Sequence, residues 1–288
     1  MRADKVTPQS LLSQKQNGTA IAAVTAYDYP TARLADESGI DIVLVGDSLG
    51  MAVLGYEDTL SVTMEEMLHH ARAVRRAVQQ AMLVVDFPYG SYQISVEDTV
   101  RNALRFVKES GSQAVKLEGG VSQATRVQAL TTAEIPVFGH IGLIPQSVHR
   151  MGGYRVQGLS EATAAQVCKD ALALQAAGAI ALVLEGIPRE LAASITSLLT
   201  IPTIGIGAGP DCDGQILVFH DLFSLSFRQP PKFVRSFGNA ATLIRNGLED
   251  FREAVRTRSF PNDRESYHMP AGVSIELTGA HQPANGKR

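Results

Sequence analysis

The chain has 288 residues, of which 45% are hydrophobic and 19% charged, and its formal net charge is -3. This balance is typical of a globular protein with one sizeable core, and it excludes the basic field that nucleic acid or an acidic membrane surface requires. No segment has the apolar length of a membrane span or a signal peptide, and Cys168 and Cys212 lack metal-binding or CxxC spacing. We therefore expect a cytoplasmic protein without disulfides and without a nucleic-acid or membrane partner.

Short apolar segments alternate with longer segments of helical composition. The apolar segments are rich in Val, Ile and Leu and lack regular polar alternation, as is typical of parallel strands covered on both faces. The clearest helical segments are 61–80, 95–111 and 160–178. The predicted strands cover residues 21–28, 41–48, 81–87, 113–119, 135–142, 179–186, 201–209 and 214–223.

About eight strand and helix pairs over this length predict an α/β fold, a closed (β/α)8 TIM barrel, with an open doubly wound sheet as the alternative. An extra helix is expected before the first strand, between Pro8 and Gly18, where it could close the floor of the barrel. We expect a single barrel domain over residues 1–258. Residues 259–288, rich in Pro, Gly and polar side chains, are expected to form a partly disordered tail.

Four of the predicted strands end on an acid, at Asp47, Asp86, Glu118 and Glu185. In a (β/α)8 barrel the C-terminal ends of the strands surround the mouth, where active sites lie. One such acid alone is usually a helix cap or a solvated loop residue. The repetition favours a shared site in which the four carboxylates converge.

Converging carboxylates would repel one another unless a cation lay among them. Oxygen ligands favour Mg²⁺, because zinc sites prefer His and Cys. Lys116 and Glu118 are two residues apart in KLEG, so a strand directs both side chains into the same mouth. Three acids, Mg²⁺ and Lys116 would together be nearly neutral, so a small anion could bind. A structural pairing of Lys116 with a helix carboxylate is the alternative.

Three further features of the sequence each have two possible interpretations. His140, in FGHIG at the end of the fifth predicted strand, is either a core histidine or a site residue. The glycines of GIGAG at 205–209 fit either backbone binding of phosphate or tight packing at the mouth. The segment 146–158, QSVHRMGGYRVQG, is long enough for a lid but is also compatible with a plain connection.

Several long motifs resemble those of the 3-methyl-2-oxobutanoate hydroxymethyltransferase family, which forms ketopantoate in pantothenate biosynthesis. The resemblance runs from about residue 6 to residue 266 and implies a barrel of the phosphoenolpyruvate/pyruvate-type superfamily, Mg²⁺, 5,10-methylenetetrahydrofolate as one-carbon donor and a homodecamer. The motifs are TAYDYPTARLADESGIDIVLVGDSLGM, GYEDTLSVTMEEM, KLEGG, GHIGLIPQSVHRMGGYRVQG, LVLEGIP and IPTIGIGAGPDCDGQILVFHDLF.

Position by position, the resemblance implies metal ligands at Asp47 in VGDSLG and Asp86 in VVDFP, both also contacting substrate. It implies a substrate contact at Ser48, and in KLEGG a substrate-binding Lys116. In the same motif Glu118 would serve the metal, either directly or through water. The residues 222–237 have fewer glycines than the family pattern, and the last two dozen residues have no counterpart in it.

The same resemblance implies a catalytic base at Glu185 in LVLEGIP and a place near the substrate for His140. The expected activity is transfer of a hydroxymethyl group from 5,10-methylenetetrahydrofolate to 3-methyl-2-oxobutanoate through a Mg-stabilised enolate, giving 2-dehydropantoate. The alternatives are a Mg²⁺-dependent lyase or mutase of the same superfamily acting on another 2-oxo acid, and an oligomeric scaffold or small-molecule sensor without chemistry. A missing acid would indicate the last, and all four are present.

Overall fold

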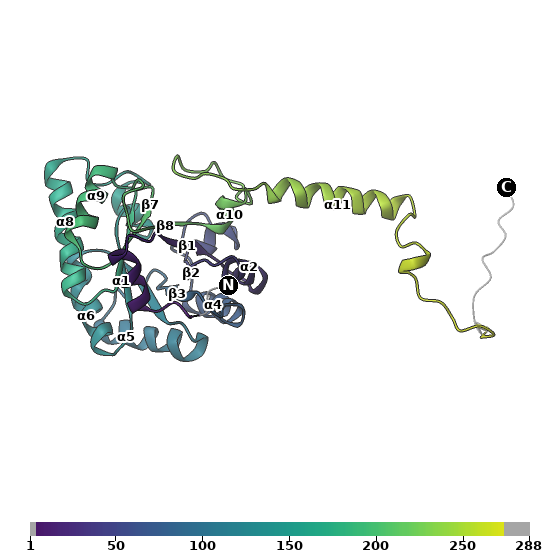
Figure 1. Ribbon diagram of the computed structural model, residues 1–288, viewed down its shortest axis with the longest axis horizontal. Coiled ribbons are helices and arrows are strands. Elements are labelled where there is room, and N and C mark those ends of the chain that lie inside the picture. Colours follow the sequence, from purple (N-terminus) through teal and green to yellow (C-terminus); the bar gives the residue numbers. More distant parts are fainter. Residues whose placement is uncertain (1–3, 274–288) are drawn as a thin grey trace. The chain divides into compact units, whose positions relative to one another are not determined.

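The computed structural model describes residues 4–273, except for the side chain of Met151. Eight parallel strands form a closed barrel in chain order, from β1 beside β2 to β8 beside β1, and the helices between them surround it (Figure 1). The predicted (β/α)8 barrel is therefore confirmed, and the open sheet is excluded. The strands are β1 Ile21–Thr25, β2 Ile42–Val45, β3 Met82–Asp86, β4 Ala114–Glu118, β5 Val137–Gly142, β6 Ala181–Glu185, β7 Thr203–Ile206 and β8 Gly214–Leu217.

Most of the long helices have a side-chain N-cap. Thr63, Ser95 and Ser160 each accept a hydrogen bond from a backbone N–H in the first turn, which satisfies a group that the helix itself leaves unpaired. The helices are α1 Pro8–Gln16, α2 Tyr29–Glu37, α3 Leu49–Ala52, α4 Met64–Ala77, α5 Val96–Arg105, α6 Ala124–Thr132, α7 Val148–Met151, α8 Glu161–Ala176, α9 Arg189–Leu198, α10 Phe219–Leu222 and α11 Ala240–Arg256, with short turns η1 Phe106–Ser110, η2 Val121–Gln123, η3 Pro145–Ser147 and η4 Asp263–Glu265.

The helix predicted before the first strand is α1, and it lies at the N-terminal ends of the strands. Gln14 donates a hydrogen bond to Asp41, which directly precedes β2, over 2.9 Å. Lys15 makes an ion pair of 2.7 Å with Asp213, which directly precedes β8. These contacts attach α1 to the floor of the barrel, as the sequence predicted.

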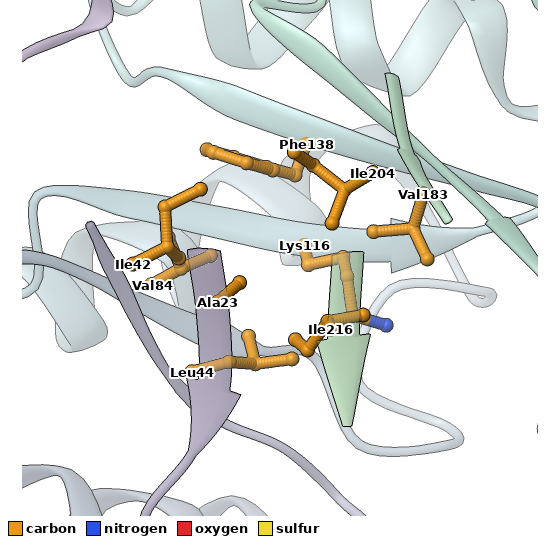
Figure 2. A pocket seen from close by; sticks show the side chains of 9 residues that line it. All are labelled: Ala23, Ile42, Leu44, Val84, Lys116, Phe138, Val183, Ile204 and Ile216. Atoms are coloured by element: carbon orange, nitrogen blue, oxygen red, sulfur yellow. The ribbon is translucent and has the colours of Figure 1, made fainter. Parts of the chain in front are cut away.

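Two apolar cores hold the barrel, one between strands and helices and one inside the ring of strands. The inner core leaves a void of about 10 Å³, which is at the lower limit for one water molecule and is lined almost entirely by carbon. Figure 2 shows the carbon stem of Lys116 among these side chains. The interior below Lys116 is therefore a packed layer, and any ligand has to bind above it, at the mouth.

Two predicted elements differ from the structure in their ends. The last predicted strand, 214–223, stops at Leu217, and residues Phe219–Leu222 form α10. The N–H of Phe219 donates to Oγ1 of Thr25 over 3.0 Å, which starts this helix on a residue from β1. The predicted helix 95–111 is helical throughout, but its last turn, Phe106–Ser110, is a π-helix.

The chain forms two compact units, Met1–Asn239 and Ala240–Arg288. The second unit begins at α11, whereas the domain boundary expected from composition, after residue 258, falls at the other end of this helix. Of the tail expected from 259, residues 274–288 lie outside the described part. None of the helices between residues 4 and 273 is long and apolar enough to cross a membrane.

Candidate active site

The four predicted acids come to the same end of the barrel, each at the C-terminal end of its strand. Asp86, Glu118 and Glu185 are the last residues of β3, β4 and β6, and Asp47 follows β2 after one glycine. The carboxylates of Asp47, Asp86 and Glu118 are buried, and that of Glu185 keeps 14% of its surface exposed. The register of parallel strands therefore produces the convergence that the sequence predicted.

A tight turn brings Asp47 and Asp86 together. The backbone N–H of Asp47 donates to Oδ2 of Asp86 over 3.2 Å. Gly46 makes this approach possible, since a Cβ there would lie 2.8 Å from Oγ of Ser48 and 3.3 Å from Oδ2 of Asp86. The glycine of VGDSLG is thus required by the closeness of the β3 carboxylate.

Lys116 places a buried cation among the acids. Its Nζ lies 3.2 Å from Oδ1 of Asp86 and 3.1 Å from Nδ1 of His140. Burial alone would lower the pKa of Lys116, but the carboxylates of Asp86, Glu118 and Asp47 outweigh it and raise this pKa. The amine is therefore fully charged at neutral pH and can hold an anionic ligand.

His140 connects two of the acids. Its Nδ1 lies 3.5 Å from Oε1 of Glu118 and its Nε2 lies 3.1 Å from Oε2 of Glu185. Burial and Lys116 lower its pKa, but the two carboxylates outweigh them and raise the pKa to about 9. Below that pH the Nδ1 proton faces Glu118; above it, the neutral ring accepts at Nδ1 from Lys116. The structure thus places His140 between two of the strand-end acids, and its role in the site stays a prediction.

The charges of this cluster are not balanced by protein groups alone. Burial, together with the nearby carboxylates of Glu118 and Asp86, raises the pKa of Asp47 well above its usual value. Burial raises the pKa of Asp86 as well, against the opposing effect of Lys116. Glu118 differs: burial would raise its pKa, but His140, Lys116 and the N–H of Gln146 lower it. Asp86 has Lys116 as its ion-pair partner, so Asp47 is the carboxylate of the cluster with the least compensation.

The donor set at Asp47 and Asp86 fits a hard divalent cation. Oδ1 of Asp86 is buried without a hydrogen-bond partner among the described residues, because the Lys116 contact has unsuitable angles. Mg²⁺ commonly binds one or two carboxylates and completes its shell with water and substrate oxygens. Within residues 4–273, however, no three His, Cys, Asp or Glu side chains are grouped so that they could hold a metal ion. The ligand set of Asp47, Asp86 and Glu118 therefore stays a prediction.

Ser48, the predicted substrate contact, is held by a tyrosine. Its Oγ lies 2.8 Å from the hydroxyl of Tyr27, which is buried in the loop after β1. Burial raises the pKa of Tyr27 beyond its usual range, so this hydroxyl keeps its proton. The pair fixes the Ser48 hydroxyl beside Asp47 in the turn that follows β2.

Gln146 and Tyr92 belong to the same buried network and were not predicted. Nε2 of Gln146 donates to Oδ2 of Asp47 over 2.8 Å, and the Tyr92 hydroxyl donates to Oε1 of Gln146 over 2.8 Å. The only sequence signal was the position of Gln146 at the start of the predicted lid, 146–158. The lid itself contains η3 and α7, and its Gln157 N–H donates to the carbonyl of Gly186.

Packing accounts for the glycines of GIGAG. A Cβ at Gly205 would lie 2.9 Å from Sγ of Cys212, one at Gly207 would lie 2.6 Å from the Phe233 ring, and one at Gly209 would lie 2.4 Å from Cβ of Arg189. These distances are shorter than real Cβ contacts allow. Close approach of neighbouring side chains is therefore sufficient to require glycine here.

Comparison with known proteins identifies the family. The family model described as ketopantoate hydroxymethyltransferase matches residues 5–263 of the chain. The chain belongs to this family. It is therefore an enzyme of the hydroxymethyltransferase type, and the acids at the barrel mouth form its candidate active site.

Two relatives illustrate how far the similarity extends. The 3-methyl-2-oxobutanoate hydroxymethyltransferase of Koribacter versatilis is 59% identical over 273 residues, covering 95% of this chain and 92% of that protein. The enzyme of the same name from Pelobacter propionicus is 54% identical over 264 residues, covering 92% and 98%. The similarity therefore extends over nearly the full length of the chain, and the range of the family model contains all eight strands.

Solved structures show the same fold in more distant proteins. A phosphonopyruvate hydrolase matches with a TM-score of 0.58 at 14% identity, covering 90% of this chain and 93% of that one. A 2,3-dimethylmalate lyase, a member of the PEP mutase/isocitrate lyase superfamily, matches with a TM-score of 0.56 at 17% identity, covering 90% and 91%. At such low identity the likeness extends to the fold alone, which agrees with the superfamily implied by the sequence.

Proposed function

We propose that this ketopantoate hydroxymethyltransferase family member transfers a hydroxymethyl group from 5,10-methylenetetrahydrofolate to 3-methyl-2-oxobutanoate, forming 2-dehydropantoate in pantothenate biosynthesis. One observation carries the proposal: Glu185 is the least buried acid of the cluster and is paired with His140, while Lys116 lies on the other side of that ring. The imidazole of His140 thus lies between the carboxylate of Glu185, as the base, and the ammonium of Lys116, as a fixed cation.

Glu185 is the base in this proposal. It removes the C3 proton of the 2-oxo acid, and the electron pair of that C–H bond moves into the enolate, whose charge develops on the keto oxygen. Water adds to the one-carbon unit of the folate, both of its carbon–nitrogen bonds break, and the two nitrogens take up the protons of that water, so that tetrahydrofolate leaves. The enolate carbon then forms a carbon–carbon bond with the released one-carbon unit, and the proton held by Glu185 passes to its oxygen, which becomes the hydroxyl of the product.

Lys116 stabilises the negative charge that develops on the substrate oxygen, and His140 positions the base. The Lys116 ammonium remains protonated and is aimed from the buried layer into the mouth, where it stabilises a carboxylate or enolate oxygen. His140, with a pKa of about 9, is positively charged at neutral pH and lies 3.1 Å from Oε2 of Glu185 through its Nε2, so its charge holds that carboxylate in place before the reaction. Ser48, fixed by Tyr27, is placed to bind a substrate oxygen.

Asp47 and Asp86 would hold Mg²⁺, with Glu118 serving it directly or through water. When bound, Mg²⁺ supplies Lewis acidity toward the keto and carboxylate oxygens of the substrate, which makes the C3 proton more acidic. The two aspartates fit this role because the backbone N–H of Asp47 donates to the Asp86 carboxylate, which brings both residues to one turn, and because burial and nearby carboxylates raise the pKa of Asp47. We further propose a cytoplasmic location and a homo-oligomer, with the family's decamer as the expected form.

Proton NMR of 3-methyl-2-oxobutanoate in deuterated buffer tests the base and the transfer separately. With protein and Mg²⁺ but no folate, the C3 proton signal is expected to disappear as deuterium replaces it. Adding 5,10-methylenetetrahydrofolate is expected to give the hydroxymethylated product. Glu185→Gln should reduce exchange by at least about 10²-fold, the usual contribution of general-base catalysis.

The controls separate loss of the base from loss of the fold. Glu190→Gln, an acid of the first turn of α9 outside the cluster, should exchange like the wild type. Exchange that is equally fast in Glu185→Gln would refute the base. Neither exchange nor product in the wild type would refute the substrate and favour a lyase or mutase acting on another 2-oxo acid.

A further inference from the structure

Gln146 joins the ends of three neighbouring strands. Its Nε2 donates to Oδ2 of Asp47 after β2 and to the carbonyl oxygen of Phe87 after β3, both over 2.8 Å. Its backbone N–H donates to Oε2 of Glu118 at the end of β4 over 3.0 Å. Gln146 is itself buried in η3, in the segment between β5 and α8. One residue of the predicted lid therefore contacts two of the three predicted metal ligands.

The direction of the Gln146 amide is fixed by its partners. Its Nε2 faces the Asp47 carboxylate and the Phe87 carbonyl, and both of these groups can only accept a hydrogen bond. If the amide were flipped, its oxygen would face these two oxygens and neither hydrogen bond could form. On the other side, Oε1 accepts from the buried Tyr92 hydroxyl, which in turn accepts the N–H of Glu118 over 3.3 Å. Tyr92 and Gln146 therefore form a rigid unit behind the acids.

This unit determines how Asp47 presents its oxygens. Among the hydrogen bonds of the described residues, the Asp47 carboxylate uses Oδ2 alone, with Gln146 as its donor. The other oxygen, Oδ1, is left for a further ligand. Hydrogen bonds of this kind orient metal-binding carboxylates, and their loss commonly costs 10- to 100-fold in metal affinity.

We propose that Gln146, supported by Tyr92, is a positioning residue that orients the Asp47 and Glu118 carboxylates for a divalent cation. This role rests on the proposed function, because it assumes that the acids bind Mg²⁺. A purely structural role, in which Gln146 only anchors the lid, would affect stability without affecting the cation. Cation affinity and stability therefore have to be measured on the same variants.

Calorimetric titration of the full-length protein with Mg²⁺, without substrate, tests the proposal. Gln146→Met keeps the length and volume of the side chain but removes its donor and acceptor, and is expected to weaken Mg²⁺ binding about 10- to 100-fold. Tyr92→Phe removes only the hydroxyl and is expected to weaken it less. Because both act through one amide, the double variant should lose less than the product of the two effects.

Gln113→Met is the matched control. Gln113 makes a comparable side-chain hydrogen bond, accepting from the N–H of Leu83 over 3.1 Å, but lies just before β4 at the opposite end of that strand from Glu118. This variant should bind Mg²⁺ like the wild type, whatever it loses in melting temperature. Tyr92→Phe, which preserves the packed ring, tests the proposal even where Gln146→Met folds poorly.

The outcomes separate this role from the function on which it rests. Wild-type Mg²⁺ affinity in both Gln146→Met and Tyr92→Phe would overturn the positioning role while leaving the function standing. Weakened Mg²⁺ binding in these variants would support the role, even where C3 exchange were absent from every protein and the substrate were thereby refuted. A wild type that binds no divalent cation would overturn both.

Discussion

Among the single residues, Asp47 has an unfavourable electrostatic environment in the metal-free protein. Its pKa is raised above the unfolded value by burial and by the carboxylates of Glu118 and Asp86, so stability is lost as pH rises from the unfolded pKa through the folded-state pKa. Above the unfolded pKa the burial of this acid is therefore a penalty. A cation that binds there removes the penalty and links folding to metal binding.

Asp47→Asn is expected to stabilise the metal-free protein while it removes Mg²⁺ binding. The amide keeps an oxygen for the Gln146 donor but carries no charge against Asp86 and Glu118. In chelator we expect a gain of about 1 kcal/mol or more in the free energy of unfolding, or roughly 2–4 °C in melting temperature. Added Mg²⁺ should raise the melting temperature of the wild type only. A lower melting temperature of the variant in chelator would contradict the assignment of repulsion.

His140 makes the free energy of unfolding depend on pH in the same direction as Asp47 does. Its folded pKa, about 9, lies above the unfolded value of 6.5, so its contribution is fully present below pH 6.5 and is lost as pH rises through 9. In metal-free protein we expect the free energy of unfolding to fall by up to about 3 kcal/mol over this range. His140→Gln should flatten the profile, as measured by urea denaturation at each pH. An unchanged slope would show that the imidazole is neutral in the folded state.

At the scale of elements, β5 and α8 pack together through a glycine. A Cβ at Gly139 would lie 2.6 Å from Cδ2 of Leu182 and 2.7 Å from Cδ1 of Leu174, both fully buried. Gly139→Ala is expected to cost about 1–3 kcal/mol in the free energy of unfolding, as overpacking of a core usually does. Denaturant titration would measure it, with Gly247→Ala in α11, where no atom lies within 4 Å, as the neutral or stabilising control.

Element by element, the sequence predicted the part of this fold that depends on local pattern. Apolar runs located all eight strands, and the acids at their ends located the mouth, because both signals are carried by consecutive residues. The end of β8 was missed, since the apolar composition continues into α10 and the cap that starts it comes from Thr25.

The site was predictable where its residues lie at or near the C-terminal ends of strands, as the four acids, Lys116 and His140 do. Gln146 and Asp47 are 99 residues apart in the chain, and Tyr27 and Ser48 are 21 apart. Tyr27 and Ser48 fall within one of the long motifs, but neither that spacing nor the separation of Gln146 from Asp47 indicates a contact, since both contacts depend on how the loops close over the barrel. The strand-end acids could therefore be predicted, whereas the residues that orient them required the structure.

For the molecule as a whole, α11 bears an apolar face that the described residues of its own unit leave largely exposed, with the ring of Phe260 packed against Phe251. Ile244, Leu248, Phe251 and Val255 recur at spacings of four and three residues, which places them on one side of the helix. Their exposed fractions are 50%, 63%, 54% and 47%. Monomeric proteins rarely leave such a stripe in water. A second copy of the chain is the partner that the expected homo-oligomer provides.

Leu248→Glu is accordingly expected to lower the order of the oligomer, because a carboxylate in this face would be buried without a partner on assembly. Asn246→Glu places the same charge on the opposite side of α11 and should leave assembly unchanged. Analytical ultracentrifugation at matched concentrations measures both. Full assembly of Leu248→Glu would exclude this face from the subunit contacts. Circular dichroism of each variant would show whether α11 is still helical. A smaller oligomer with unchanged helix content would indicate loss of the subunit contact, whereas a lower helix content would indicate loss of the helix itself.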